Sequence, residues 1–292
     1  MKKNILIVSL LFFSIMLQAQ SRIIIIGAHP DDCEIIAGGS TIKLLEQGHA
    51  VKFVSLTNGN KGHHILTSKQ IEEVRGKEVQ QVRDQFNLAY EVLDYNDGEL
   101  VANLESRDQV IKLIREWKAD IVITHPPYDY HPDHRNTSTI VQDAAFLVTV
   151  PLAVPSTPYL RDNPLFLYML GRLHNPYKEN TEIVVDIAPV LERKVQMLSA
   201  HNSQFFEWLP WIDKIKEEIP QDKAGKTTYL TNYITKRNQV IKQDKEAIKK
   251  WYGKKYIRTI RTVERFEYCP FGRKVTDEEL KTLFPVFGAN QP

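Results

Sequence analysis

The stretch IIIIGAHPDD, Ile23–Asp32, decides the fold of this chain. Four consecutive isoleucines predict a strand that is buried on both faces, as in a parallel sheet. The residues that follow place one imidazole and two adjacent carboxylates where this strand ends. We therefore expect polar, metal-binding chemistry at the carboxyl edge of the sheet.

A second stretch later in the chain repeats this arrangement. Ile121–Thr124 is another apolar run, and a short loop connects it to His131-Pro132-Asp133-His134. Two apolar strands that each lead into a His/Asp cluster indicate one site built from two loops.

Strands and helices alternate between and around these clusters. Strands are predicted at 23–26, 51–56, around 91–93 and at 121–124, and helices at about 39–47, 67–86, 106–117 and 134–146. This alternation predicts an α/β fold: a Rossmann-like three-layer αβα architecture with a mainly parallel, doubly wound sheet. In the strand order 3-2-1-4, the first and fourth strands are neighbours, and ligands bind outside their carboxyl ends. The loops around His29–Asp32 and Asp129–His134 are thus expected to meet.

The composition is ordinary for a globular protein, with 42% hydrophobic and 25% charged residues. A net charge of +2 argues against nucleic acid as the main partner, because no strong field attracts phosphates. The sequence carries no signal for an oligomeric state.

The N-terminal residues are set aside from the fold. Residues 1–19 combine Lys2-Lys3, an apolar run and Ala19, which is typical of a cleaved signal peptide. The apolar run is shorter than the roughly twenty residues of a membrane-spanning helix; an uncleaved anchor and a buried element are the alternatives. We expect residues 20–292 to form a single domain that is periplasmic or secreted, without stable membrane insertion.

The two clusters suit zinc. Imidazole nitrogens with a carboxylate favour this ion, and a catalytic zinc keeps three protein ligands and one open position. Pro30 restricts the first loop, which helps His29 and Asp32 converge, and His134 is expected to open a helix and point back toward them. The predicted ligands are therefore His29, Asp32 and His134.

Three further side chains of the clusters predict catalysis. Asp31 is a free carboxylate beside the ligands and is the candidate general base. His131 is the candidate acid or oxyanion stabiliser, and Asp133 is expected to orient it and favour its charged form.

These motifs resemble the paired signatures of the PIG-L (LmbE-like) deacetylases. The resemblance runs from about Ile23 to Gln204, and its residues are Ala28–Asp32 with Glu34 and Gly38-Gly39, His131–His134, Thr57–Gly59 with Gly62, Asp97-Gly98, Asp186-Ile187, Lys194 and His201–Gln204. Cys33 departs from the pattern, which often has Glu or Ala there. The segment after about 205 also departs from it, and we expect a C-terminal helical extension there.

The resemblance implies a zinc-dependent hydrolase, an exported bacterial member, that removes acetyl or other acyl groups from N-acylated amino sugars such as N-acetylglucosaminyl conjugates. It implies one zinc per chain on His29, Asp32 and His134, with Asp31 as base and His131, paired with Asp133, as acid or electrostatic partner. It also implies that Asp97 contacts a sugar hydroxyl and that His201 belongs to the substrate site; packing of a helix is the alternative role for His201. The substrate would be a small molecule or glycan.

Other readings stay open. The chain could act on a larger acyl group or a thiol-sugar amide, or bind zinc and glycans without turnover. Cys33 and Cys269 could pair or stay separate. The aromatic residues at 205–211 could stack on sugars, pack in the core or form a lid, and His63-His64 could line the pocket or a plain loop. The lysine-rich stretch at 230–252, with isoleucines every seventh residue, could present a solvated face or an anion-binding one.

Overall fold

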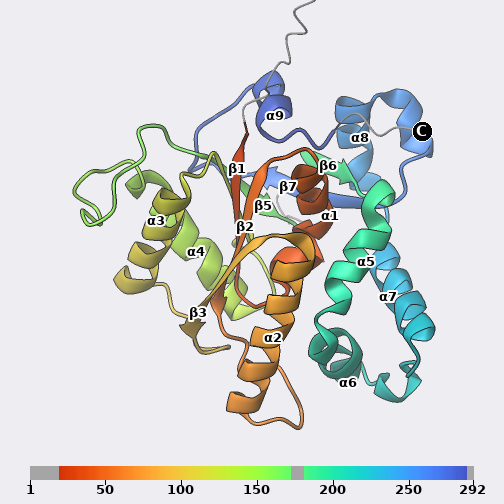
Figure 1. Cartoon of the computed structure of the whole chain (residues 1–292). Helices are drawn as coiled ribbons and strands as arrows, with labels where there is room; N and C mark the ends of the chain where they lie inside the picture. Colours follow the sequence, from red (N-terminus) through yellow and green to blue (C-terminus); the bar gives the residue numbers. More distant parts are fainter. Residues whose placement is uncertain (1–19, 172–180, 288–292) are drawn as a thin grey trace, which may run out of the picture.

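A central sheet organises the molecule, whose computed structural model describes residues 20–171 and 181–287 (Figure 1). The strands follow the order β3-β2-β1-β4-β5-β7-β6. Their bounds are β1 Arg22–Gly27, β2 Ala50–Thr57, β3 Ala89–Tyr95, β4 Ile121–Thr124, β5 Leu165–Met169, β6 Ile183–Asp186 and β7 Val263–Tyr268. The first five strands are parallel, and β7 is antiparallel to both β5 and β6. The predicted order 3-2-1-4 and the mainly parallel sheet are confirmed.

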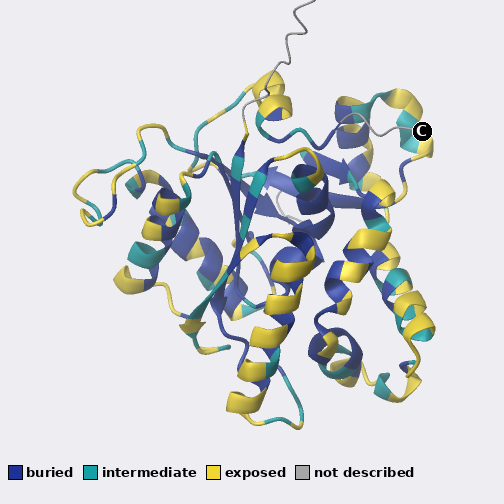
Figure 2. Ribbon diagram, in the orientation of Figure 1, coloured by how far each residue is buried: buried dark blue, intermediate teal, exposed yellow. Residues whose placement is uncertain are grey.

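Helices cover both faces of this sheet and complete three layers (Figure 1). Their bounds are α1 Asp32–Glu46, α2 Ser68–Phe86, α3 Leu104–Trp117, α4 Pro132–Leu147, α5 Leu191–Ser199, α6 Leu209–Ile212, α7 Lys223–Arg237, α8 Lys245–Tyr252 and α9 Asp277–Leu283. Side chains alternate along β1, so Ile23 and Ile25 pack with α1, α2 and α5, whereas Ile24 and Ile26 pack with α3 and α4. All four isoleucines are fully buried, and Figure 2 shows the sheet as the buried centre.

Local signals placed most helix ends correctly. Thr67 caps α2 and forms a capping box with Gln70. The first helix was expected at about 39–47, but α1 begins at Asp32, directly after the first cluster. The predicted ligand Asp32 thus lies in the first turn of a helix, where its position is fixed by the helix backbone.

The C-terminal region differs from the expected extension in two ways. The lysine-rich stretch is two helices, α7 and α8, because Gln239 pairs with Thr262 and Val240 donates its N–H to Arg261 O (2.9 Å) between them. This backbone pairing takes the chain out of the helix before Ile241. The same region also supplies β7, which lies inside the central sheet.

The cysteines and the N-terminal segment were two further points of the sequence analysis. Cys33 and Cys269 are separate, buried free thiols, and Cys33 donates its S–H to backbone carbonyls. The signal peptide predicted at 1–19 lies outside the described residues. Within the described part of the chain, the helices are all too short or too polar to cross a membrane.

A buried ion pair holds α1 to the C-terminal half. Lys194 Nζ, on α5, lies 2.6 Å from Glu264 Oε1, on β7, and both side chains are fully buried. Glu264 accepts the backbone N–H groups of Gly39 and Ser40 (2.7 Å each), while Lys194 donates to Ile35 O (2.8 Å). In a regular helix the N–H of Gly39 would donate to Ile35 O. The ion pair therefore bonds to the N–H of Gly39 and to the carbonyl oxygen of Ile35, which a regular helix would join to each other.

Gly39 permits this close approach, and Gly39→Ala should destabilise the fold. A Cβ there would lie 2.6 Å from Ile187 Cγ2 and 3.0 Å from Glu264 Oε1. We expect a loss of about 2 kcal/mol in the free energy of unfolding, measured by urea denaturation, because the packed neighbours must shift.

Gly76→Ala is the matched control, since nothing lies within 4 Å of a Cβ at this position of α2. It should leave stability unchanged or raise it by up to about 1 kcal/mol. Equal effects of the two substitutions would contradict the steric argument.

Candidate metal centre and active site

The two His/Asp clusters meet at the carboxyl edge of the sheet, as expected. β1 and β4 are paired up to Ile26 and Thr124, so the chain segments after them leave the sheet side by side. His29 Nδ1 lies 3.2 Å from His134 Nε2 and 3.4 Å from Asp32 Oδ2, and His134 Nε2 lies 3.3 Å from Asp32 Oδ1. The structure thus brings together the three side chains predicted as ligands.

A carboxylate lies beside the outer nitrogen of each of these imidazoles. His29 Nε2 is 3.1 Å from both Asp133 Oδ2 and Asp97 Oδ1, and His134 Nδ1 is 3.0 Å from Asp129 Oδ1. A carboxylate on one ring nitrogen keeps the proton there and leaves the other nitrogen free to bind a metal. This arrangement leaves His29 Nδ1 and His134 Nε2 as the nitrogens that could bind a metal.

Asp32 is held by its own hydrogen bonds. Its Oδ2 accepts the N–H groups of His29 (2.7 Å) and Ala28 (3.1 Å) and lies 3.2 Å from His125 Nε2. The ring of His125 is fully buried and stacks on that of His134, with centroids 4.0 Å apart. His125 thus orients two candidate ligands at once.

The geometry and charge of this group fit a zinc ion. Ligands at the corners of a tetrahedron with zinc–ligand bonds of about 2.0–2.1 Å lie about 3.3 Å apart, which matches the observed separations. Burial opposes a charge on His29, but Asp133, Asp32 and Asp97 outweigh it and hold its pKa well above the usual value. Burial also opposes a charge on His134, yet Asp32 and Asp129 raise its pKa to about 9. The site therefore favours a cation.

Asp31 lies beside the ligands, but it is not the free carboxylate that the sequence suggested. Its Oδ1 is 3.2 Å from Arg75 Nη2, and the two side chains are almost fully buried. Arg75 also donates to Pro30 O (2.6 Å) and so holds the loop that carries His29. Arg75 was missed, although a charged residue on the apolar face of α2, four residues after Ile71, was a usable signal.

The expected pairing of Asp133 with the ring of His131 is wrong. The Asp133 carboxylate faces His29 and accepts the N–H of Gly98 (2.6 Å), because α4 begins at Pro132 and directs this side chain back toward β1. His131 instead caps α4, and its Nδ1 accepts the N–H of Asp133. Burial and the neighbouring His29 and His134 lower the pKa of His131, which disfavours the imidazolium form.

The two residues predicted to bind substrate have different outcomes. Asp97 lines the same cavity as the ligands and contacts His29, so it is placed to touch a substrate as well as to orient the ring. His201 is fully buried and bonds to Glu34 Oε1 (2.9 Å). Its assignment to the substrate site is wrong, because α5, which precedes it, packs against α1 and α2, and His201 is not part of the cavity lining.

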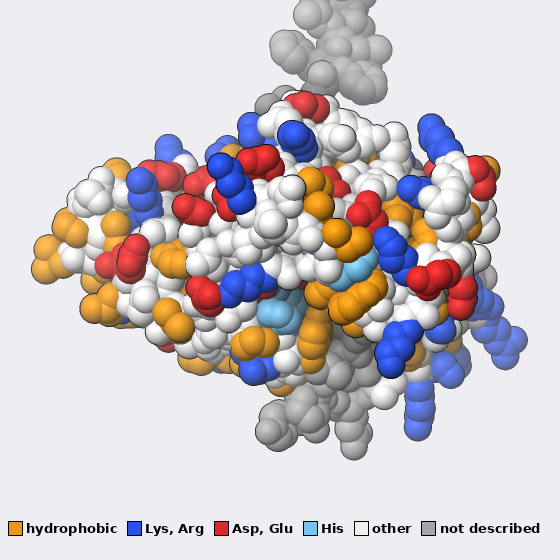
Figure 3. All heavy atoms as spheres, turned by 90° about the horizontal axis from the view of Figure 1, so that it is seen from below, with side chains coloured by type: hydrophobic (Ala, Val, Ile, Leu, Met, Phe, Trp, Pro, Cys, Tyr) orange, Lys and Arg blue, Asp and Glu red, His pale blue; other side chains and the backbone are white. Residues whose placement is uncertain are grey.

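A cavity of about 310 Å³ opens beside the ligands at this edge of the sheet. Its lining includes Asp31, His131 and Asp97 together with the predicted ligands, and also Tyr130 and Trp208. Figure 3 views the molecule from this edge and shows histidine side chains at the surface with hydrophobic side chains beside them. The cavity thus combines a polar, acidic interior with aromatic walls.

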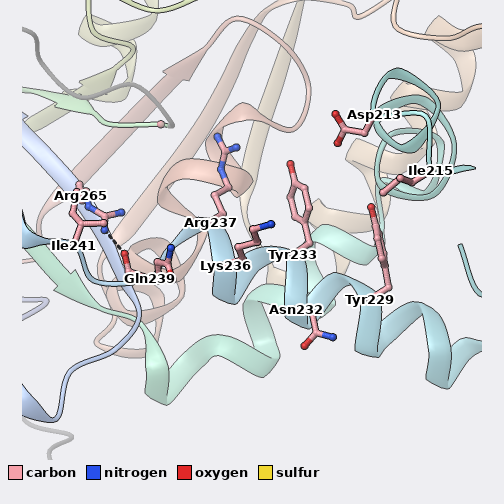
Figure 4. Close-up of a pocket in the computed structure, with 11 residues that line it drawn as sticks. Asp213, Ile215, Tyr229, Asn232, Tyr233, Lys236, Arg237, Gln239, Ile241 and Arg265 are labelled. Carbon is pink, nitrogen blue, oxygen red and sulfur yellow. Dashed lines mark hydrogen bonds between the residues drawn. The ribbon is translucent and has the colours of Figure 1, made fainter. Parts of the chain in front are cut away.

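A second cavity, of about 610 Å³, lies along α7 (Figure 4). Tyr229, Tyr233, Lys236 and Arg237 of α7 line it, opposite Asp213. None of the metal-ligating clusters found among the described residues belongs to its lining. We therefore place the chemistry in the smaller cavity at the strand ends.

Three comparisons bear on this site. Residues 24–145 match the family model PIG-L, described as GlcNAc-PI de-N-acetylase. Diacetylchitobiose deacetylase of Thermococcus kodakarensis is 29% identical over 210 residues, which are 66% of this chain and 76% of that protein. The structure of N,N'-diacetylchitobiose deacetylase from Pyrococcus horikoshii, in complex with an inhibitor, superposes with a TM-score of 0.62 at 25% identity, covering 85% of this chain and 84% of that one.

The same fold also occurs in an enzyme of another reaction class. GalB, the 4-carboxy-2-hydroxymuconate hydratase of Pseudomonas putida, superposes with a TM-score of 0.64 at 18% identity, covering 88% of this chain and 99% of that one. This likeness concerns the fold alone, so the reaction has to be argued from the site. The matched segment contains both clusters, so the part of this chain that builds the site is the part that matches the PIG-L family model.

Proposed function

We propose that this chain is a zinc-dependent hydrolase that removes an acetyl group from an N-acetylated amino sugar, with N-acetylglucosaminyl compounds as its substrate class. The observation that carries the proposal is the convergence of His29, Asp32 and His134 on one cavity with Asp31 and His131. The similarity to diacetylchitobiose deacetylases supports the reaction and the substrate class. The N-terminal pattern at 1–19 supports export of the enzyme.

The predicted ligands, Asp31 and Arg75 have distinct tasks in this reaction. Zinc held by His29, Asp32 and His134 would supply a Lewis acid that polarises the amide carbonyl and acidifies water. Asp31 would take a proton from the attacking water and return it to the departing nitrogen, so that the amide and water become acetate and a free amine. Arg75 fixes the direction of this carboxylate.

His131 is suited to stabilise the developing charge. Its Nδ1 accepts the N–H of Asp133, so the neutral ring carries its proton on Nε2. From there it can donate a hydrogen bond to the carbonyl oxygen as negative charge develops.

The decisive experiment is amine release from diacetylchitobiose. We expect activity from the mature protein with zinc, loss after treatment with a chelator, and recovery after addition of one equivalent of zinc. Absence of amine release, despite one tightly bound zinc per chain, would reject the deacetylase. It would favour a larger acyl substrate, a binding role or the hydratase chemistry that also occurs on this fold.

Metal content tests the ligand set separately from activity. His134→Ala should abolish stoichiometric zinc binding, because it removes a donor atom. Asp129→Asn should weaken zinc binding only about 10–100-fold, since it removes the partner of His134 Nδ1 but keeps the ligand. Zinc content measured after dialysis distinguishes the two, and full occupancy in His134→Ala would refute its role.

A further inference from the structure

An aromatic column borders the catalytic cavity, and the proposed reaction does not use it. The rings of His63 and His64 are stacked with centroids 4.7 Å apart, His64 and Trp211 are stacked at 5.1 Å, and Trp211 and Trp208 at 5.3 Å. The loop between β2 and α2 supplies the histidines, and the tryptophans come from the π-helical turn Gln204–Trp208 and from α6. Helical turns of this kind are frequent at functional sites.

Hydrogen bonds hold the column in place. His63 Nε2 lies 3.0 Å from Glu207 Oε2, and its Nδ1 accepts the N–H groups of Ile65 and Leu66. Gln204, which begins the π-helical turn, donates to Gly62 O. The rings are thus ordered before any ligand binds, which reduces the entropy that binding costs.

The column ends at the cavity. Trp208 lines the same cavity as His29 and Asp31, and Ile212 of α6 lies at its rim. Trp211 is 48% exposed, and Tyr130, which packs edge-on against its sequence neighbour His131 and also lines the cavity, is 70% exposed. A cluster that served only the core would not leave large rings in water at the mouth of a polar cavity.

Sugar rings match this surface chemically. A pyranose with equatorial hydroxyl groups has apolar C–H faces, whose slightly positive hydrogens pack on the negative face of an aromatic ring. The acidic interior of the cavity suits the ring that carries the reacting amide, whereas the aromatic rim suits a neighbouring ring outside it.

We propose that the column, through Trp208, is a binding subsite for a second sugar ring, so that the substrate is a glycoside or oligosaccharide rather than a free monosaccharide. This inference rests on the proposed function for its catalytic readout, but the binding of the second ring can be measured without turnover. Trp208 and its supporting ring Trp211 would then set specificity.

Binding of diacetylchitobiose to the Asp31→Asn protein, followed by calorimetry, provides the first test. Trp208→Ala and Trp208→Leu, which keeps apolar volume but no ring face, should each weaken the binding of the disaccharide at least tenfold. The affinity for N-acetylglucosamine, which has no second ring, should fall much less in both variants. The control is Phe146→Ala, which removes an exposed ring far from the cavity lining, and it should have no effect.

Kinetics provide the second test. The ratio of kcat/KM for diacetylchitobiose to that for N-acetylglucosamine should fall about tenfold in Trp208→Leu. Unchanged disaccharide affinity in both folded Trp208 variants would overturn the subsite. If the wild-type protein binds the disaccharide through Trp208 but releases no amine, the subsite stands and the proposed reaction fails.

Discussion

Asp31→Asn should lower kcat for deacetylation by about 10³-fold while the protein still binds zinc. A positioned general base contributes roughly 10²–10⁴-fold to such a reaction. The amide of asparagine keeps the size of the side chain but cannot accept a proton at neutral pH. Because Asp31 is not one of the three converging donors, the zinc content measured alongside should stay near one per chain.

Two controls separate a lost base from a disturbed site. Asp84→Asn makes the same chemical change on the exposed face of α2 and should leave kcat unchanged. Arg75→Lys retains a positive charge beside Asp31 but loses the planar group that holds Pro30 O, so it should lower kcat less than Asp31→Asn does. Near-normal kcat in a zinc-loaded Asp31→Asn protein would exclude Asp31 as the base.

The convergence of the ligands could be predicted because it depends on sheet topology. The Ile23–Ile26 run marks a central strand, and the strand order places its end beside that of Ile121–Thr124. Parallel strands end at one edge, so the chain segments that carry His29, Asp32 and His134 leave the sheet side by side.

The partners of those ligands could not be predicted, because they depend on side-chain direction. Asp133 is two residues from His131 in sequence, but the first turn of α4 directs its carboxylate to His29 instead. Arg75 and Glu264 are distant in sequence from the groups they contact. The lysine-rich stretch had a helical pattern, yet pairing of Gln239 with Thr262 interrupts it.

The stability of α1 is expected to depend on the buried ion pair between Lys194 and Glu264. Lys194→Met would leave the buried Glu264 carboxylate without its ion-pair partner; among the described residues it would still accept the N–H groups of Gly39 and Ser40 and the hydroxyl of Ser40. Removing one member of a buried pair typically costs 3–5 kcal/mol, so we expect a loss of about 4 kcal/mol in the free energy of unfolding. Urea denaturation of the metal-free protein would measure this loss.

A double substitution tests whether the unpaired buried charge causes the loss of stability expected in Lys194→Met. Lys194→Met combined with Glu264→Gln should cost less than the sum of the two single changes, because no unpaired charge remains. Lys250→Met is the matched control, since it breaks an exposed ion pair with Asp277 and should cost at most about 1 kcal/mol. A similarly small cost for Lys194→Met would contradict the argument. A large cost would mean that β7 stabilises the helix whose first residue is the predicted ligand Asp32, and thus that the C-terminal region supports the candidate metal site from a distance.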